Sequence, residues 1–112
     1  MHVKTYNKLI RNRIPEIIAA NGKTCRTRQA DGAEYRGLLE KKCMEEWQEY
    51  LESGSLEEMA DLMEVIEAIC KARGFDPAAL QAVKQEKAAK RGAFEKRIFL
   101  HAVAEPDELL DR

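Results

Sequence analysis

Two short acidic strings near the middle of the chain have the residue types and spacing needed to bind a metal ion. Glu46 and Glu49 lie three residues apart in the first string, and Glu58 and Asp61 repeat this spacing in the second. Side chains three residues apart on an α-helix share a face, with Cβ atoms roughly 5–6 Å apart. Hard divalent cations prefer oxygen ligands. Each string therefore predicts half of a site for such a cation.

The expected direction of these carboxylates distinguishes them from ordinary surface acids. Helical periodicity places Glu46 on the same stripe as Leu39 and Tyr50, and Asp61 on the same side as Leu62. A carboxylate directed into a core is costly unless it is neutralised, and neither string contains a Lys or Arg. Either string alone is typical of a solvated helix face. Both together, on neighbouring helices, favour a metal site.

Charge is segregated along the chain although the formal net charge is only −1. Residues 1–28 and 84–97 are mainly basic, whereas residues 40–67 are mainly acidic. An acidic centre with two basic arms suits a metal ion together with a polyphosphate. The balanced total supplies no field for a nucleic-acid polymer or an anionic membrane.

Start and stop signals predict four helices that would hold these side chains. The expected helices cover residues 14–21, 32–53, 56–73 and 77–91, with Asp31 and Asp76 as caps and with Pro15 and Pro77 at first helical positions. Ser55 and Glu58 have the spacing of a capping box. The short break at residues 53–55 makes the two central helices antiparallel neighbours.

The expected fold is mainly α, an antiparallel bundle of about four helices forming a single domain over residues 1–112. A small β element is predicted from residues 24–28 and 97–103, which have strand composition. One apolar stripe is too broad for a single neighbouring helix to cover, which predicts a homodimer or a larger assembly; it contains Leu56, Met59, Leu62, Met63, Ile66 and Cys70.

Other classes of protein are disfavoured by composition. The three cysteines are scattered without a CxxC pair, which argues against a disulfide framework or a zinc site. No apolar run approaches the roughly 20 residues of a membrane helix, and the first residues lack the apolar stretch of a secretory signal. We therefore expect a cytoplasmic protein with no membrane partner.

The two strings, written ExxE and ExxD, resemble the signature of the MazG-like superfamily of all-α nucleoside triphosphate pyrophosphatases. The opening YNKLIRNRIPEII at residues 6–18 and the closing KAAKRGAF and RIFL at residues 87–94 and 97–100 are similar to the small stand-alone house-cleaning branch. The likeness spans Tyr6 to Leu100. This chain departs from that branch in its short spacing between Glu49 and Glu58, and in Asn12 and Arg13, where Asp and Lys are common.

The resemblance implies hydrolysis of a nucleoside triphosphate to the monophosphate and pyrophosphate, with damaged or noncanonical nucleotides among the candidate substrates. It implies Mg²⁺, with Mn²⁺ as a substitute, held by Glu46, Glu49, Glu58 and Asp61. Glu46 and Glu49 are the candidates for the catalytic base. The basic arms supply Lys8, Arg11, Lys87 and Arg91 as phosphate-binding residues. Residues that recognise the base are not indicated.

Two alternatives stay open at this point. Phosphoribosyl-ATP pyrophosphatase of histidine biosynthesis shares the acidic motif, although the opening string favours the house-cleaning branch. A non-catalytic helical module is the other alternative, in which the acids form a solvated face and the helices serve dimerisation.

Overall fold

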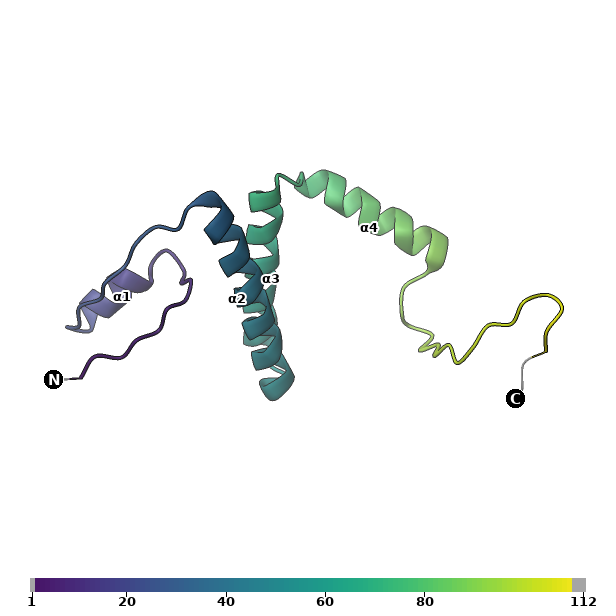
Figure 1. Ribbon diagram of the computed structural model, residues 1–112, viewed down its shortest axis with the longest axis horizontal. Helices are drawn as coiled ribbons and strands as arrows, with labels where there is room; N and C mark the ends of the chain where they lie inside the picture. The colour runs from purple at the N-terminus through teal and green to yellow at the C-terminus, as the bar shows by residue number, and fades with distance from the viewer. Residues whose placement is uncertain (1, 110–112) are drawn as a thin grey trace. The chain divides into compact units, whose positions relative to one another are not determined.

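The computed structural model describes residues 2–109, which form four helices and no strand (Figure 1). The helices are α1 (Ile14–Ala20), α2 (Gly32–Ser53), α3 (Leu56–Arg73) and α4 (Pro77–Arg91). This confirms the mainly α class and the four predicted helices. The chain divides into two compact units, one ending at Pro77 and the other beginning at Ala78. The ends of the predicted single domain, residue 1 and residues 110–112, lie outside the described residues.

The predicted caps explain where the central helices begin and end. Asp31 Oδ1 accepts a hydrogen bond from the Glu34 amide at 2.8 Å and so starts α2, while Ser55 Oγ accepts from the Glu58 amide at 3.2 Å and starts α3. Gly54 ends α2 with a φ of 63°, in the left-handed region that glycine adopts without steric cost. A two-residue connection therefore joins the two longest helices.

The capping box at the start of α3 is only half formed, which corrects the prediction. In a complete box the Glu58 carboxylate would accept from the Ser55 amide. That amide instead donates to Ser53 Oγ at 3.2 Å. The Glu58 carboxylate is consequently available for other contacts.

The predicted β element is wrong for the described residues. Residues 24–28 and 97–103 have no regular secondary structure, and they belong to different compact units. Their apolar side chains are mostly exposed, including Ile98 and Phe99. Strand composition expresses packing on a half-buried surface, and an isolated two-stranded hairpin is marginal in water. Without a packed face, the composition alone does not produce a strand.

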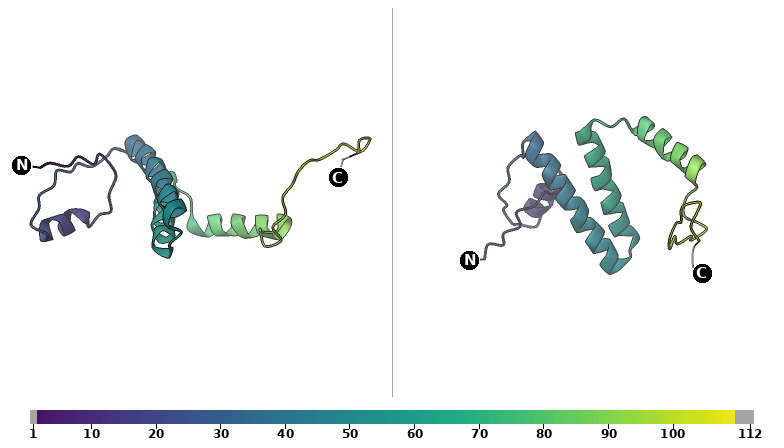
Figure 2. Two further views of the ribbon diagram at one scale, coloured as in Figure 1. Left: turned by 90° about the horizontal axis from the view of Figure 1, so that it is seen from below. Right: turned by 45° about the vertical axis from the view of Figure 1, so that its right-hand side comes forward.

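The core of the first unit lies between α2 and α3, which pack side by side and antiparallel (Figure 2). Leu39 from α2 and Leu62 and Val65 from α3 are buried there. Much of the predicted apolar stripe on α3 stays exposed, with Leu56 at 80% and Met63 at 50%. No described helix has the length and apolar character needed to span a membrane.

Candidate metal centre

Three of the four predicted carboxylates converge between α2 and α3. Glu46, Glu58 and Asp61 each offer one oxygen, and these oxygens all lie within 4.8 Å of one another. The short connection at Gly54 makes this possible, because it places the acidic turns of the two antiparallel helices near the same closed end. We refer to these three residues as the acidic triad.

Glu46 is the most unusual member of the acidic triad because it is buried. Its side chain is only 9% exposed, and Glu46 is the one buried charged residue in the described part of the chain. Its Oε2 atom and the Oε2 atom of Glu58 are both buried without a hydrogen-bond partner among the described residues. A buried carboxylate oxygen without a partner carries a full desolvation cost. Two such oxygens in one cluster indicate a site suited to a cation.

Glu49, the fourth predicted ligand, is exposed and lies outside the acidic triad. It nevertheless affects the site. Burial raises the pKa of the Glu46 carboxyl, the neighbouring Glu49 carboxyl raises that pKa further, and Lys42 partly opposes the shift. The ionised form of Glu46 is therefore disfavoured in this protein unless a positive charge is added nearby.

Two basic residues from outside the acidic strings contact the triad. Lys42 Nζ lies 3.4 Å from Glu46 Oε1, one turn earlier on α2, and Arg11 Nη2 lies 2.6 Å from Asp61 Oδ1. Neither residue belongs to the acidic strings, so the composition of the strings does not reveal either contact. The i,i+4 spacing of Lys42 to Glu46 could have identified the first. No local pattern could have paired residues 50 positions apart.

The predicted phosphate-binding residues of the N-terminal arm lie in the same compact unit as the triad. Lys8 borders a small hollow against α2, which Lys41 and Lys42 also line. Its Nζ atom lies 5.5 Å from the centre of the Tyr6 ring. Arg11 contacts the triad directly. The structure thus brings this arm to the acidic residues.

The other two predicted phosphate-binding residues, Lys87 and Arg91, lie exposed on α4 in the second unit. Within residues 2–109 neither of them forms an ion pair, whereas Lys90 Nζ is 2.7 Å from Glu86 Oε1. Lys90 is thus already paired within its own helix, whereas the phosphate-binding role of Lys87 and Arg91 stays a prediction. Their approach to the acidic triad stays a prediction.

A divalent cation fits the donor set of the acidic triad. All of its donors are carboxylate oxygens, and the triad's three carboxylates face only two basic groups, Lys42 and Arg11. The two orphaned oxygens supply ligands that no described residue uses. Mg²⁺ is commonly held by one or two carboxylates together with water and phosphate oxygens, and these residues can provide the protein share of such a site.

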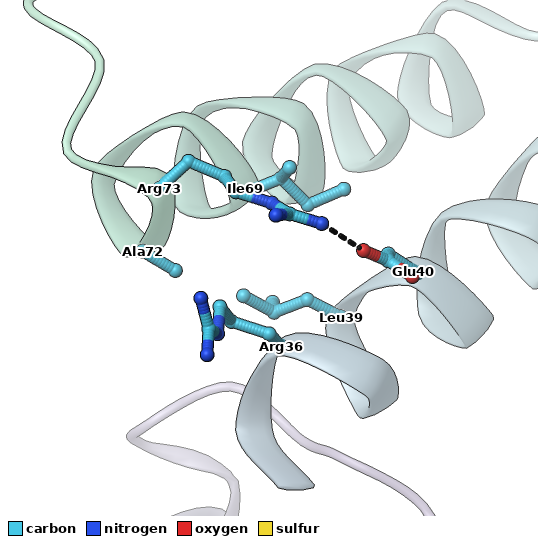
Figure 3. Close-up of a pocket in the computed structure, with 6 residues that line it drawn as sticks. All are labelled: Arg36, Leu39, Glu40, Ile69, Ala72 and Arg73. Atoms are coloured by element: carbon cyan, nitrogen blue, oxygen red, sulfur yellow. Dashed lines mark hydrogen bonds and ion pairs between the residues drawn. The ribbon is translucent and has the colours of Figure 1, made fainter. Parts of the chain in front are cut away.

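A second hollow near the opposite end of the same helix pair has a different character. Figure 3 shows Arg73 of α3 reaching Glu40 of α2, and the Nη2–Oε1 distance is 3.0 Å. Leu39 and Ile69 lie beside this pair, and the hollow has no room for a ligand. It is a closed surface contact and not a binding site.

Comparisons with family models, with curated proteins and with solved structures give no match for this chain. The function is therefore inferred from the geometry of the acidic triad together with the ExxE and ExxD strings.

Proposed function

We propose that the protein is a Mg²⁺-dependent nucleotide pyrophosphohydrolase, which converts a nucleoside triphosphate to the monophosphate and pyrophosphate. The observation that carries this proposal is the buried Glu46, which belongs to the acidic triad together with Glu58. Each of these two residues keeps one buried carboxylate oxygen without a hydrogen-bond partner among the described residues. Acids that were simply solvated would be exposed and would leave no buried oxygen unpaired. The resemblance of the ExxE and ExxD strings to the MazG-like superfamily selects the reaction.

Glu46, Glu58 and Asp61 would hold the cation, and Glu49 would complete the set from its exposed position. When bound, Mg²⁺ supplies charge neutralisation and a Lewis acid for phosphoryl transfer. Reactions of this class depend on positioning and electrostatics without a covalent nucleophile. Every carboxylate near the triphosphate therefore has to be balanced by positive charge.

The basic residues bind the triphosphate tail, since guanidinium groups match phosphate oxygens in bidentate geometry and lysines act as point charges. Lys8 and Arg11 would do so from the N-terminal arm, and Lys87 and Arg91 from α4. Of the two candidate bases, Glu49 is favoured over Glu46. Its carboxylate is exposed and outside the triad, so water can reach it directly.

The direct test measures pyrophosphate and orthophosphate release from a panel of ribo- and deoxyribonucleoside triphosphates, with and without Mg²⁺. We expect Mg²⁺-dependent release of pyrophosphate from at least one triphosphate, with the monophosphate as the other product. Phosphoribosyl-ATP belongs in the panel because its exclusive use would identify the histidine-pathway alternative. The matched control is Glu57→Gln, which removes an exposed acid adjacent to Glu58 without altering the triad. Absence of pyrophosphate release from every compound would refute the proposal.

Self-association is the second part of the proposal. Exposed apolar side chains remain on both central helices, including Leu56 and Met63 on α3 and Met44 and Leu51 on α2. Such a surface is typical of an interface between helical subunits. Light scattering at micromolar concentration should give at least the mass of a dimer, and a monomer would contradict this part. A dimer that releases no pyrophosphate would favour the non-catalytic dimerisation module.

A further inference from the structure

The contact between Arg11 and Asp61 joins the N-terminal arm to the acidic triad. Arg11 Nη2 donates to Asp61 Oδ1 at 2.6 Å, across 50 positions of sequence. Within the described part of the chain, no other hydrogen bond or ion pair is recorded between residues 2–21 and α2 or α3. Arg13, two residues further on, pairs instead with Glu16 within its own segment.

The acidic triad is more than a group of acids, because Glu46 is nine-tenths buried and keeps an oxygen without a partner. Asp61 belongs to the same triad, whose three ligand oxygens lie within 4.8 Å of one another, and it is the member that Arg11 contacts. A divalent cation among these oxygens would place a second positive charge against a carboxylate that already holds a guanidinium. Two cations on one carboxylate repel each other, and both Arg11 and Asp61 are exposed enough for the arginine to leave.

We propose that Arg11 is the internal counter-ion of Asp61, that a divalent cation displaces it, and that the released guanidinium then binds the phosphate oxygens of the substrate. This inference rests on the proposed metal site. Cation binding and polyanion binding are then coupled through one side chain. Without the anion, the Arg11–Asp61 contact weakens cation binding. With both ligands present, the bound cation releases Arg11 so that it can contact the anion.

The first experiment measures the affinity of the protein for Mg²⁺ and Mn²⁺ by calorimetry without nucleotide, in the wild type, Arg11→Ala, Arg11→Lys and the control Arg13→Ala. Arg11→Ala should bind the cations about two- to fivefold more tightly, because no ion pair has to be broken. Arg11→Lys should be intermediate, and Arg13→Ala should match the wild type. With Mg²⁺ present, Arg11→Ala should bind inorganic pyrophosphate roughly tenfold more weakly than the wild type.

The second experiment follows hydrogen exchange of the Ile14 amide, which donates to the Arg11 carbonyl oxygen at 3.1 Å, before and after Mg²⁺ is added. Exchange should become faster in the wild type as Arg11 is released, and it should already be fast in Arg11→Ala.

The outcomes separate this inference from the proposed function. Cation binding that is unchanged or weakened in Arg11→Ala, or exchange that is unaffected by Mg²⁺ in a wild type that binds it, would overturn the role of Arg11 alone. A wild type that binds neither cation would overturn both proposals.

Discussion

Charged residues are balanced at one end of the α2–α3 pair and unbalanced at the other. Toward the open end, Glu40 and Arg73 form a one-to-one pair on the surface. Toward the connected end, three carboxylates face two basic groups, and the most buried carboxylate keeps an unpartnered oxygen. The same two helices therefore contain one neutral contact and one site with unbalanced negative charge.

The charged groups at the open end are paired with each other, whereas those at the connected end are available to a ligand. An exposed ion pair contributes little to stability, typically about 0–1 kcal/mol, and nothing in it calls for an added ion. A buried carboxylate with a free oxygen is costly to keep unless binding a ligand compensates for it. The contrast between Lys90, which pairs with Glu86, and Arg91 follows the same division on α4.

The largest effect should come from removing one charge from the acidic triad. Asp61→Asn or Glu46→Gln should reduce kcat/KM by roughly 100-fold or more at ordinary Mg²⁺, since even changes outside the ligand set of metal sites cost about 10–100-fold. Glu40→Gln, the control from the open end, should keep wild-type activity. Steady-state pyrophosphate release measures both. Full activity in either triad variant would remove that residue from the metal site.

On α4 the division between paired and unpaired charges predicts a moderate effect. Arg91→Ala should lower kcat/KM by roughly 10- to 100-fold, because a charge-assisted hydrogen bond to phosphate contributes about 1.5–3 kcal/mol. The loss should be similar for every base, and Arg91→Lys should recover only part of it because the bidentate geometry is lost. Lys90→Ala should change little. A changed ranking among bases, with efficiency on the best substrate intact, would instead make Arg91 a specificity residue.

Removing a charge from the acidic triad should lower activity but should not lower the stability of the metal-free protein. Glu46→Gln should leave the metal-free protein as stable as the wild type or more stable by about 1 kcal/mol or less, because it removes one of several repelling charges. Thermal unfolding in chelator, with Glu57→Gln as the matched control, measures this difference. A large loss of stability in Glu46→Gln would show that the Lys42–Glu46 pair is structural.

The difference in free energy of unfolding between Glu46→Gln and the wild type should depend on pH with a definite sign. The folded-state pKa of Glu46 is raised above its usual value of 4.5, so the folded protein binds this proton more readily than the unfolded chain. Above the folded-state pKa, the ionised Glu46 carboxylate therefore lowers the free energy of unfolding. This loss of stability disappears as the pH falls through that pKa toward 4.5. The greater stability of Glu46→Gln relative to the wild type should decrease over the same pH range. An advantage that grows on acidification would contradict the assignment.

The smallest effect should be at the open end of the helix pair. Glu40→Gln and Arg73→Ala should each change the free energy of unfolding by about 1 kcal/mol or less, and a double-mutant cycle should give a coupling of about 0.2–1 kcal/mol. Denaturant unfolding measures these values. A coupling well above this range would mean that the two ends of the pair differ less than their geometry indicates.

Local signals were enough to predict the helices. Pro15, Asp31, Ser55 and Gly74 act within a turn or so of their own positions, so the start and stop residues of the helices could be read directly. The inward direction of Glu46 also followed from helical periodicity. Its burial confirms that part of the prediction.

Features that depend on distant residues could not be obtained in this way. The pairing of Arg11 with Asp61 requires the path of the N-terminal arm, which no periodicity encodes. The failure of residues 97–103 to form a strand depends on the lack of a packed face, although their composition is that of a strand. The exposed position of Glu49 could not be obtained either, because the i,i+3 spacing does not specify how far each of the two side chains is turned toward α3.

The hydroxyl of Ser53 has a consequence beyond the connection in which it lies. Because Ser53 Oγ accepts the hydrogen bond of the Ser55 amide, the Glu58 carboxylate does not have to accept it, as it would in a complete capping box. In Ser53→Ala that amide would lose its acceptor, and the Glu58 carboxylate is the group that accepts from it in a complete capping box. The number of carboxylates offered to an ion between these helices is thus controlled by an uncharged residue in the loop, five positions before the acid that it releases.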